Sequence, residues 1–190
     1  MRPAEAGLLL LSGGRGRRMG AAKHALPHPS GGTWGAHLLR TFEAVFPGAP
    51  VQVLGDPLPD RPDLPRVDDP RLGPGRALCL WAAAEAPPVR RWWVVACDQV
   101  RWTPDRLQAW AEAARAADPE AIHWVLAHHG GHLQPLGGWL PGALRPRLAA
   151  ASGSSLKALA EALPHLVLPC AGPEWMDVDT SEERRAFEGG

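Results

Sequence analysis

The sequence predicts an α/β domain in which an open, mostly parallel sheet carries helices on both faces. Short, wholly apolar runs such as residues 8–11 and 92–97 are typical of strands that are buried on both sides. Segments with helical spacing of apolar residues alternate with these runs, and this order favours parallel strands joined by crossover helices. The 190 residues are enough for one sizeable core, so we expect a single domain over residues 1–190.

The expected strands are short apolar stretches that stop at glycine, proline or aspartate. The first, at residues 8–11, stops at Ser12-Gly13-Gly14, and the second, at residues 51–54, stops at Gly55. Residues 128–132 (HHGGH) predict a hairpin turn, and not a zinc site, because they offer no fourth ligand nearby. Further strands are expected at residues 66–68, 92–97, 122–127, 133–139, 165–168 and 176–178.

The expected helices begin at recognisable capping residues. Thr33 precedes a segment with apolar residues at helical spacing, and Thr103-Pro104 combines a cap with proline in the first turn. Thr180 and Glu183 have the spacing of a capping box. The predicted helices cover residues 33–46, 75–86, 103–117, 140–150 and 155–163, and a last helix follows Thr180.

A glycine-rich, basic loop follows the first strand and predicts a site for a polyphosphate. Residues 7–23 read GLLLLSGGRGRRMGAAK and combine four glycines after the strand with three arginines and Lys23. Glycine lets backbone N–H groups approach a ligand closely, and the basic side chains supply charge for an anion. The alternative interpretation is a basic surface loop between a strand and a helix.

Two common phosphate-binding motifs do not fit this loop. A Walker loop needs Lys-Ser or Lys-Thr directly after its last glycine, whereas Gly20 is followed by Ala21-Ala22-Lys23. The dinucleotide fingerprint needs glycine at its sixth position, where this chain has Met19.

Asp98 is the first candidate for a metal ligand, because it directly follows the buried strand at residues 92–97. Magnesium prefers one or two carboxylates together with phosphate oxygens and water. In an open parallel sheet, ligands bind beyond the carboxyl ends of the strands, where Gly13, Gly14 and Asp98 are all expected. The alternative is an aspartate that caps its own loop.

The spacing Leu-Ser-Gly-Gly, Arg18-Met19-Gly20 and Lys23 resembles the signature loop of nucleotidyltransferases with a Rossmann-like domain. The Gly-Gly pair resembles the molybdenum cofactor guanylyltransferases (MobA family) in particular, as does Gln134-Pro135-Leu136. Residues 177–180 (DVDT) resemble the Asn-x-Asn-Thr-Pro-Glu segment of that family, with aspartate at both asparagine positions. These aspartates are closer to the related cytidylyltransferases, so the choice of base stays open.

The resemblance implies a three-layer Rossmann-like nucleotidyltransferase fold and a set of site residues. Arg18 and Lys23 would be catalytic by neutralising phosphate charge, and Asp69 with Asp98 would hold Mg²⁺. Asp68 is an alternative to Asp69, and both could instead form a solvated turn; Asp56 either faces the base or belongs to a Gly-Asp-Pro turn. The implied nucleotide-binding residues are Leu11, Ser12, Gly13, Gly14, Lys23, Asp56, Asp69 and Asp98.

The same resemblance implies a reaction and its partners. GMP would pass from GTP to the phosphate of molybdopterin or Mo-molybdopterin, giving the guanine dinucleotide and pyrophosphate. Other molybdenum cofactor biosynthesis or acceptor proteins are implied as partners. The alternatives are cytidylyl transfer, another nucleotide transfer on the same scaffold, or a relative that binds nucleotide without catalysis.

Composition argues against several other classes of protein. The net charge is zero, so no nucleic-acid-binding surface is indicated. Three cysteines without a CxxC motif or a signal peptide favour a reduced cytoplasm. No apolar run reaches the roughly 18 residues of a membrane span, so we expect a soluble cytoplasmic protein.

Overall fold

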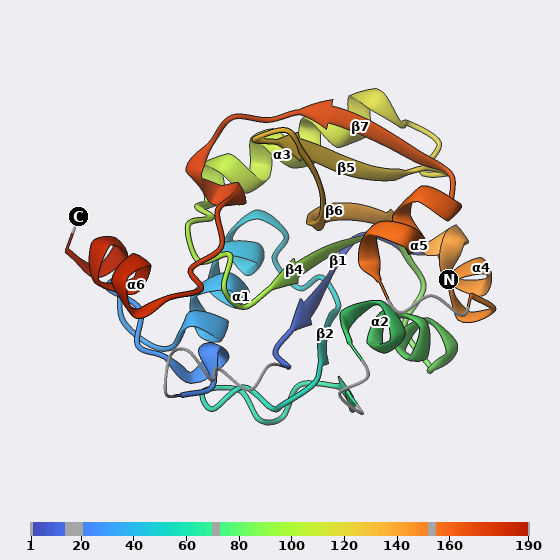
Figure 1. The fold of residues 1–190 in the computed structure, drawn as a ribbon. Helices are drawn as coiled ribbons and strands as arrows, with labels where there is room; N and C mark the ends of the chain where they lie inside the picture. The colour runs from blue at the N-terminus through green and yellow to red at the C-terminus, as the bar shows by residue number, and fades with distance from the viewer. Residues whose placement is uncertain (1, 14–20, 70–72, 152–154, 190) are drawn as a thin grey trace.

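The computed structural model describes residues 2–13, 21–69, 73–151 and 155–189. It contains one seven-stranded sheet in the order β3-β2-β1-β4-β6-β5-β7, shown in Figure 1. Among the strands described, only β6 runs antiparallel to its neighbours, so the prediction of a mostly parallel sheet is confirmed. The strands are β1 (Ala4–Leu11), β2 (Val51–Leu54), β3 (Arg66–Val67), β4 (Val89–Ala96), β5 (Trp124–His129), β6 (His132–Pro141) and β7 (His165–Pro169).

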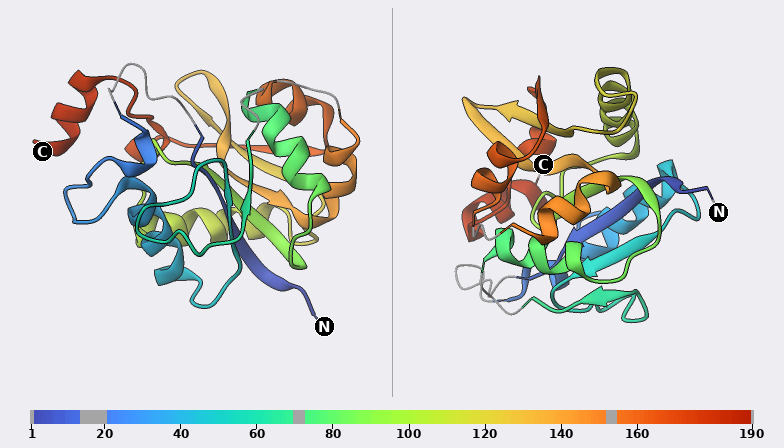
Figure 2. Two further views of the ribbon diagram at one scale, coloured as in Figure 1. Left: turned by 90° about the horizontal axis from the view of Figure 1, so that it is seen from below. Right: turned by 90° about the vertical axis from the view of Figure 1, so that its right-hand side faces the viewer.

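Helices cover both faces of the sheet, as the views in Figure 2 also show. The α-helices are α1 (Trp34–Val45), α2 (Pro74–Ala83), α3 (Pro104–Ala117), α4 (Arg145–Ala149), α5 (Leu156–Ala162) and α6 (Ser181–Glu188). Short 3-10 helices are η1 (Lys23–Ala25), η2 (Gly142–Leu144) and η3 (Pro173–Trp175). Helices α1 and α3 pack on one face, and α2, α4 and α5 pack on the other. None of the helices described is long and apolar enough to span a bilayer.

Strand β1 lies inside the sheet, between β2 and β4, and is covered by helices on both faces, which accounts for its continuous apolar run. Leu8 and Leu10 belong to the core beneath α1 and α3, whereas Leu9 and Leu11 belong to the core beneath α2 and α5. Because successive side chains of a strand point to opposite faces, both sets must be apolar. In register, Leu11 lies opposite Leu54 of β2 and Ala96 of β4, so these three parallel strands end at one rim of the sheet.

The predicted caps form in the structure. Thr33 and Thr103 each accept a hydrogen bond from the backbone of the first turn of their helix. Ser155 caps α5 in the same way, although no cap was predicted there. Thr180 and Glu183 form both hydrogen bonds of the capping box at the start of α6. These bonds satisfy N–H groups that have no partner inside the helix.

Two sequence-based expectations were wrong. Residues 140–150 do not form one helix, because Leu140 continues β6 opposite Trp92 before η2 and α4 begin. Residues 176–178 do not form a strand; the Val178 amide donates instead to the carbonyl oxygen of Asp98, at 3.1 Å. In both places tertiary pairing overrode the local pattern, which periodicity alone cannot show.

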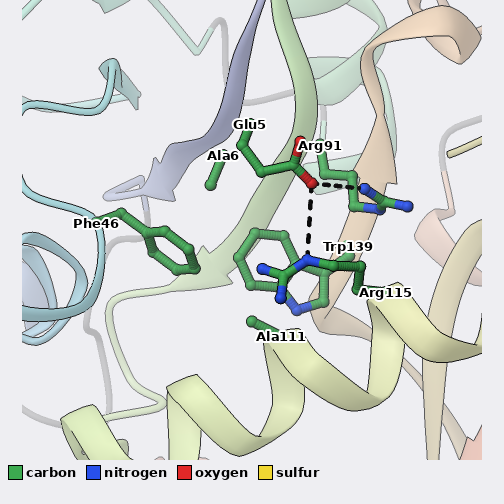
Figure 3. A pocket seen from close by; sticks show the side chains of 7 residues that line it. All are labelled: Glu5, Ala6, Phe46, Arg91, Ala111, Arg115 and Trp139. Atoms are coloured by element: carbon green, nitrogen blue, oxygen red, sulfur yellow. Dashed lines mark hydrogen bonds and ion pairs between the residues drawn. The ribbon is translucent and has the colours of Figure 1, made fainter. Parts of the chain in front are cut away.

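A small pocket lies near the opposite end of β1 from Gly13 (Figure 3). Glu5 accepts a hydrogen bond from Arg91 at 3.0 Å and lies 3.8 Å from Arg115 of α3. Arg91 is only 4% exposed and also donates to the Asp118 carbonyl oxygen. Burial lowers the pKa of Arg91, while the charge of Glu5 raises it. This pocket is therefore built around a buried cation and its partner carboxylate.

Candidate functional site

The candidate site lies at the rim where β1, β2 and β4 end. Ser12 donates from its amide to the Leu54 carbonyl oxygen at 3.0 Å, and from its hydroxyl to the Asp56 carbonyl oxygen at 2.5 Å. Cys97 donates from its amide to the Leu11 carbonyl oxygen at 3.0 Å. The turn after β1 is thus tied to the segments that follow both neighbouring strands.

Close backbone approach explains two of the glycines in this rim. Gly55 has a φ of 117°, and a Cβ atom there would lie 2.6 Å from the amide nitrogen of Gly13. A Cβ atom on Gly13 would lie 2.8 Å from Oδ2 of Asp69. Gly13 is therefore enclosed by the end of β2 on one side and by a carboxylate on another, with no room for a side chain.

The two aspartates that follow β3 have different surroundings in the structure. Asp68 pairs with Arg66 at 3.1 Å, and its side chain is 84% exposed. Asp69 lies against Gly13. Asp69 therefore remains the candidate of the two for contact with a ligand at the rim.

Lys23, in the described part of the chain, is in direct contact with two carboxylates at this rim. It begins η1, and its Nζ atom lies 2.8 Å from Oδ2 of Asp98 and also contacts Oδ1 of Asp179. The Lys23 side chain is 16% exposed and that of Asp98 is 20% exposed. Burial lowers the pKa of Lys23, but the charges and hydrogen bonds of Asp98 and Asp179 outweigh it and raise the pKa above its usual value. Lys23 is therefore a fixed cation at neutral pH.

The segment that carries Asp179 is anchored from two sides. Val178, fully buried, packs with Leu26, Trp34 and Val100, and Phe187 of α6 covers this cluster. The amide of Asp179 donates to Oε2 of Glu183 at 2.8 Å, as part of the start of α6. The Asp179 carboxylate is thus held towards Lys23 by elements that lie far from Asp98 in the sequence.

Asp177 adds a third carboxyl group to this region. Although the residue as a whole is exposed, partial desolvation of its carboxyl group, and then repulsion from Asp98 and Asp179, raise its pKa to about 7. A raised carboxyl pKa is what crowding of like charges produces. The region thus holds more negative charge than Lys23 alone neutralises.

These residues suit a divalent cation in their chemistry. Asp98 and Asp179 already enclose one cation, the Lys23 ammonium group, which marks the place where positive charge is stabilised. Among the residues that the structure describes, no three acidic, histidine or cysteine side chains are arranged as a ready-made metal site. Mg²⁺ commonly uses one or two carboxylates and completes its shell with substrate phosphates and water.

Two histidines contact the backbone of the loop that follows Asp98 and stabilise it. The imidazole rings of His28 and His37 stack with centroids 3.7 Å apart. Nε2 of His37 donates to the Trp102 carbonyl oxygen at 3.0 Å, and Nε2 of His28 lies 3.4 Å from that of Val100. Burial and then the neighbouring His28 lower the pKa of His37 to about 4. Both rings therefore hold this loop in their neutral forms at pH 7.

The structure brings some of the predicted site residues together and leaves others undescribed. Ser12, Gly13, Asp56, Asp69, Lys23 and Asp98 lie along the rim, next to the end of β1 at Leu11. Gly14 and Arg18 lie outside the described residues. Asp179 was missed as a site residue, although its segment had been singled out; the signal was an aspartate directly before a capping box.

The fold places the protein among the α/β nucleotidyltransferases. The chain belongs to the MobA-like NTP transferase domain family, whose profile matches residues 8–166. A search of curated protein sequences found no significant match.

Solved structures share this fold at low sequence identity. Rv0371c from Mycobacterium tuberculosis is 20% identical with a TM-score of 0.71, and the match covers 98% of this chain and 100% of that one. The same protein was also solved in complex with manganese, at 19% identity, a TM-score of 0.68 and full coverage of both chains. Molybdopterin-guanine dinucleotide biosynthesis protein A from Archaeoglobus fulgidus is 14% identical, with a TM-score of 0.70 and coverage of 96% and 97%. 2-C-methyl-D-erythritol 4-phosphate cytidylyltransferase from Thermus thermophilus is also 14% identical, with a TM-score of 0.64 and coverage of 95% and 96%.

Proposed function

We propose that the protein transfers GMP from GTP to the terminal phosphate of molybdopterin or Mo-molybdopterin, with Mg²⁺ as cofactor. The observation that carries this proposal is the contact of Lys23 with Asp98, at the rim of the sheet where Gly13 follows the end of β1. A basic group for phosphates and a carboxylate for a divalent cation are the two requirements of nucleotidyl transfer, and here they meet at one place. Membership of the MobA-like family supports the same class of reaction.

In the proposed reaction, an oxygen of the acceptor phosphate attacks the α-phosphorus of GTP. The bond from that phosphorus to the oxygen bridging the α- and β-phosphates breaks, and pyrophosphate leaves with the electron pair. Backbone amides at Gly13 and Gly14 hold the nucleotide, while Arg18 and Lys23 neutralise the charge that builds on pyrophosphate. When bound, Mg²⁺ supplies further positive charge to the phosphates. Catalysis of this kind depends on positioning and electrostatics and needs no covalent enzyme intermediate.

The carboxylates divide between metal and base in this proposal. Asp98 and Asp69 hold Mg²⁺, and Asp56 faces the base, where it accepts from the N1 and N2 donors of guanine. The Asp56 carbonyl oxygen already accepts from Ser12, so this residue is tied to the turn after β1. Leu11 and Ser12 complete the nucleotide site.

Cytidylyl transfer is the second candidate, and a specific observation favours it. Residues 177 and 179 are aspartates, where the guanylyltransferase pattern has asparagines. A structural relative from Thermus thermophilus is a cytidylyltransferase, which shows that the fold accommodates that chemistry.

We place either activity in the cytoplasm, as expected from the three free cysteines, with molybdenum cofactor biosynthesis or acceptor proteins as partners.

A thermal-shift comparison of GTP, CTP, ATP and UTP, each with and without Mg²⁺, tests the proposal first. A ligand at one hundred times its Kd stabilises a protein by about 2.7 kcal/mol. A Mg²⁺-dependent shift selective for GTP supports guanylyl transfer, and selectivity for CTP supports the second candidate. No shift with any nucleotide refutes both.

Release of pyrophosphate from the preferred nucleotide in the presence of molybdopterin then tests the acceptor. Nucleotide binding without pyrophosphate release, with molybdopterin or any other phosphorylated acceptor, indicates a relative that binds but does not transfer.

A further inference from the structure

Lys23 occupies a position that conflicts with its proposed role. Its ammonium group lies 2.8 Å from the Asp98 carboxylate and in contact with that of Asp179. The same group is proposed to neutralise nucleotide phosphates. A phosphate that approaches Lys23 in this state meets two carboxylates beside it, and like charges at this distance repel. The metal-free arrangement is therefore unfavourable for a polyphosphate.

Asp179 is the residue at which this arrangement departs from the guanylyltransferase pattern. Asparagine, which stands here in the guanylyltransferase pattern, would offer Lys23 a neutral oxygen and no charge. The backbone of Asp179 is fixed by Glu183 at 2.8 Å, and the adjacent Val178 amide donates to the Asp98 carbonyl oxygen at 3.1 Å. Asp98 and Asp179 are consequently held as a pair that encloses one cation.

We propose that Asp179 is a positioning residue that, together with Asp98, holds Lys23 in place of a divalent cation until that cation arrives. A divalent cation that binds Asp98 competes with the lysine for this carboxylate and releases its ammonium group for the phosphates of the nucleotide. Cation binding and nucleotide binding are thereby coupled through one side chain. This inference rests on the proposed function only in identifying the released partner of Lys23 as a nucleotide phosphate.

The coupling has two consequences that can be measured separately. Removal of the lysine charge empties the position between the carboxylates, so a divalent cation binds more tightly without any nucleotide. Removal of the Asp179 charge releases Lys23, so a nucleotide binds more tightly without any divalent cation. Both follow because Lys23 and the divalent cation compete for the Asp98 carboxylate, and such coupling is reciprocal.

The first test measures Mn²⁺ binding to the nucleotide-free protein by electron paramagnetic resonance. Lys23→Met should bind Mn²⁺ about tenfold more tightly than the wild type, the effect expected when a charge-assisted competitor is lost. Lys157→Met is the matched control, because Lys157 is 68% exposed on α5 and pairs with Glu161. Lys23→Gln serves as a second variant if the methionine variant does not fold. Unchanged or weaker Mn²⁺ binding in the folded variant overturns the proposal.

The second test measures GTP binding by calorimetry in the presence of EDTA at pH 8. Asp179→Asn should bind GTP several-fold more tightly than the wild type, and the double variant with Lys23→Met should lose this gain. Asp177→Asn is the control, since it removes the same charge two residues away, while the carboxylates that contact Lys23 are those of Asp98 and Asp179. Equal gains in GTP affinity in Asp177→Asn and Asp179→Asn would show that the loss of any nearby negative charge has this effect. That result would overturn the positioning role of Asp179.

These outcomes distinguish the inference from the proposed function. A wild-type protein that binds no nucleotide with Mg²⁺ refutes the proposed function, but the Mn²⁺ experiment uses no nucleotide and still decides whether Lys23 competes with a cation. In the converse outcome, the wild type binds GTP with Mg²⁺ while Lys23→Met binds Mn²⁺ no more tightly than the wild type. This result would retain the proposed function and refute the competition between Lys23 and the divalent cation.

Discussion

Gly55 lies so close to Gly13 that a methyl group on Gly55 would come within 2.6 Å of the Gly13 amide nitrogen. The end of β2 thus forms the wall behind the turn that follows β1. Any side chain on Gly55 would displace the backbone that is proposed to hold the nucleotide.

Gly55→Ala should therefore lower both stability and nucleotide affinity. The positive φ alone costs about 1 to 2 kcal/mol for alanine, and the contact with Gly13 adds to this. Gly48→Ala is the matched control, because Gly48 also has a positive φ, 74°, but has open space around it. Urea unfolding and GTP titration compare the two; equal losses of stability and no loss of affinity would show that the contact with Gly13 is unimportant.

Lys23→Ala should reduce turnover at least about tenfold, because a charge-assisted contact contributes roughly 1.5 to 3 kcal/mol. Pyrophosphate release at saturating nucleotide and Mg²⁺ measures the effect, and circular dichroism checks the fold. Lys157→Ala, on the exposed side of α5, should leave turnover unchanged. Wild-type turnover in Lys23→Ala would remove this lysine from the mechanism.

Asp98→Asn should abolish metal-dependent transfer, because an amide oxygen is a weaker ligand for Mg²⁺ than a carboxylate and carries no charge. Activity across a range of Mg²⁺ concentrations measures the loss. Asp105→Asn, in the exposed first turn of α3, is the control. Full activity of Asp98→Asn would place the metal at another site.

Acid should destabilise the protein through His37. Its pKa in the folded state is about 4, below the ordinary value of about 6.5, so the unfolded chain binds the proton more readily. The contribution to stability is complete above about pH 6.5 and falls by about 1.4 kcal/mol per pH unit between 6.5 and 4. Burial also lowers the pKa of His28, which acts in the same direction.

Urea unfolding of His37→Gln at several pH values checks this expectation, since the variant should lose part of the acid sensitivity. His132→Gln, at an exposed hairpin position, should retain all of it. The same pH dependence in His37→Gln and the wild type would assign the acid sensitivity to other groups.

Glu5→Gln should destabilise the fold without changing turnover. It removes the anionic partner of Arg91, which is 4% exposed, and should cost about 1 kcal/mol, because Glu5 itself is about half exposed. Glu161→Gln, which breaks an exposed pair with Lys157, should cost almost nothing. Thermal unfolding compares the variants, and loss of turnover in folded Glu5→Gln would contradict the separation of this pocket from the site.

Local sequence signals were sufficient for most of the fold. The apolar run of β1, the cap at Thr33 and the capping box at Thr180 are decided by residues within a few positions of one another, and all were predicted correctly. Leu140 was placed in a helix because its pairing with Trp92 of β4 lies 48 positions away and leaves no local pattern.

The candidate site was predictable to the extent that strand ends could be located. Asp98 was found because it follows a buried strand, and the structure places it beside Lys23. Asp179 was not identified as a site residue, although it directly follows the strand that was expected at residues 176–178. The structure has no strand there, and the position of Asp179 depends on the burial of Val178 and on Glu183. Only the folded chain shows that these distant elements converge.

The contact between Lys23 and Asp179 joins residues 156 positions apart in the chain. Contacts between residues so far apart in the chain tend to form late, after local helices and hairpins. The pairing of Lys23 with Asp179 should therefore form in the last stage of folding, when the segment before α6 docks. Formation of this contact during refolding would report completion of the native structure, whereas helical content would recover earlier.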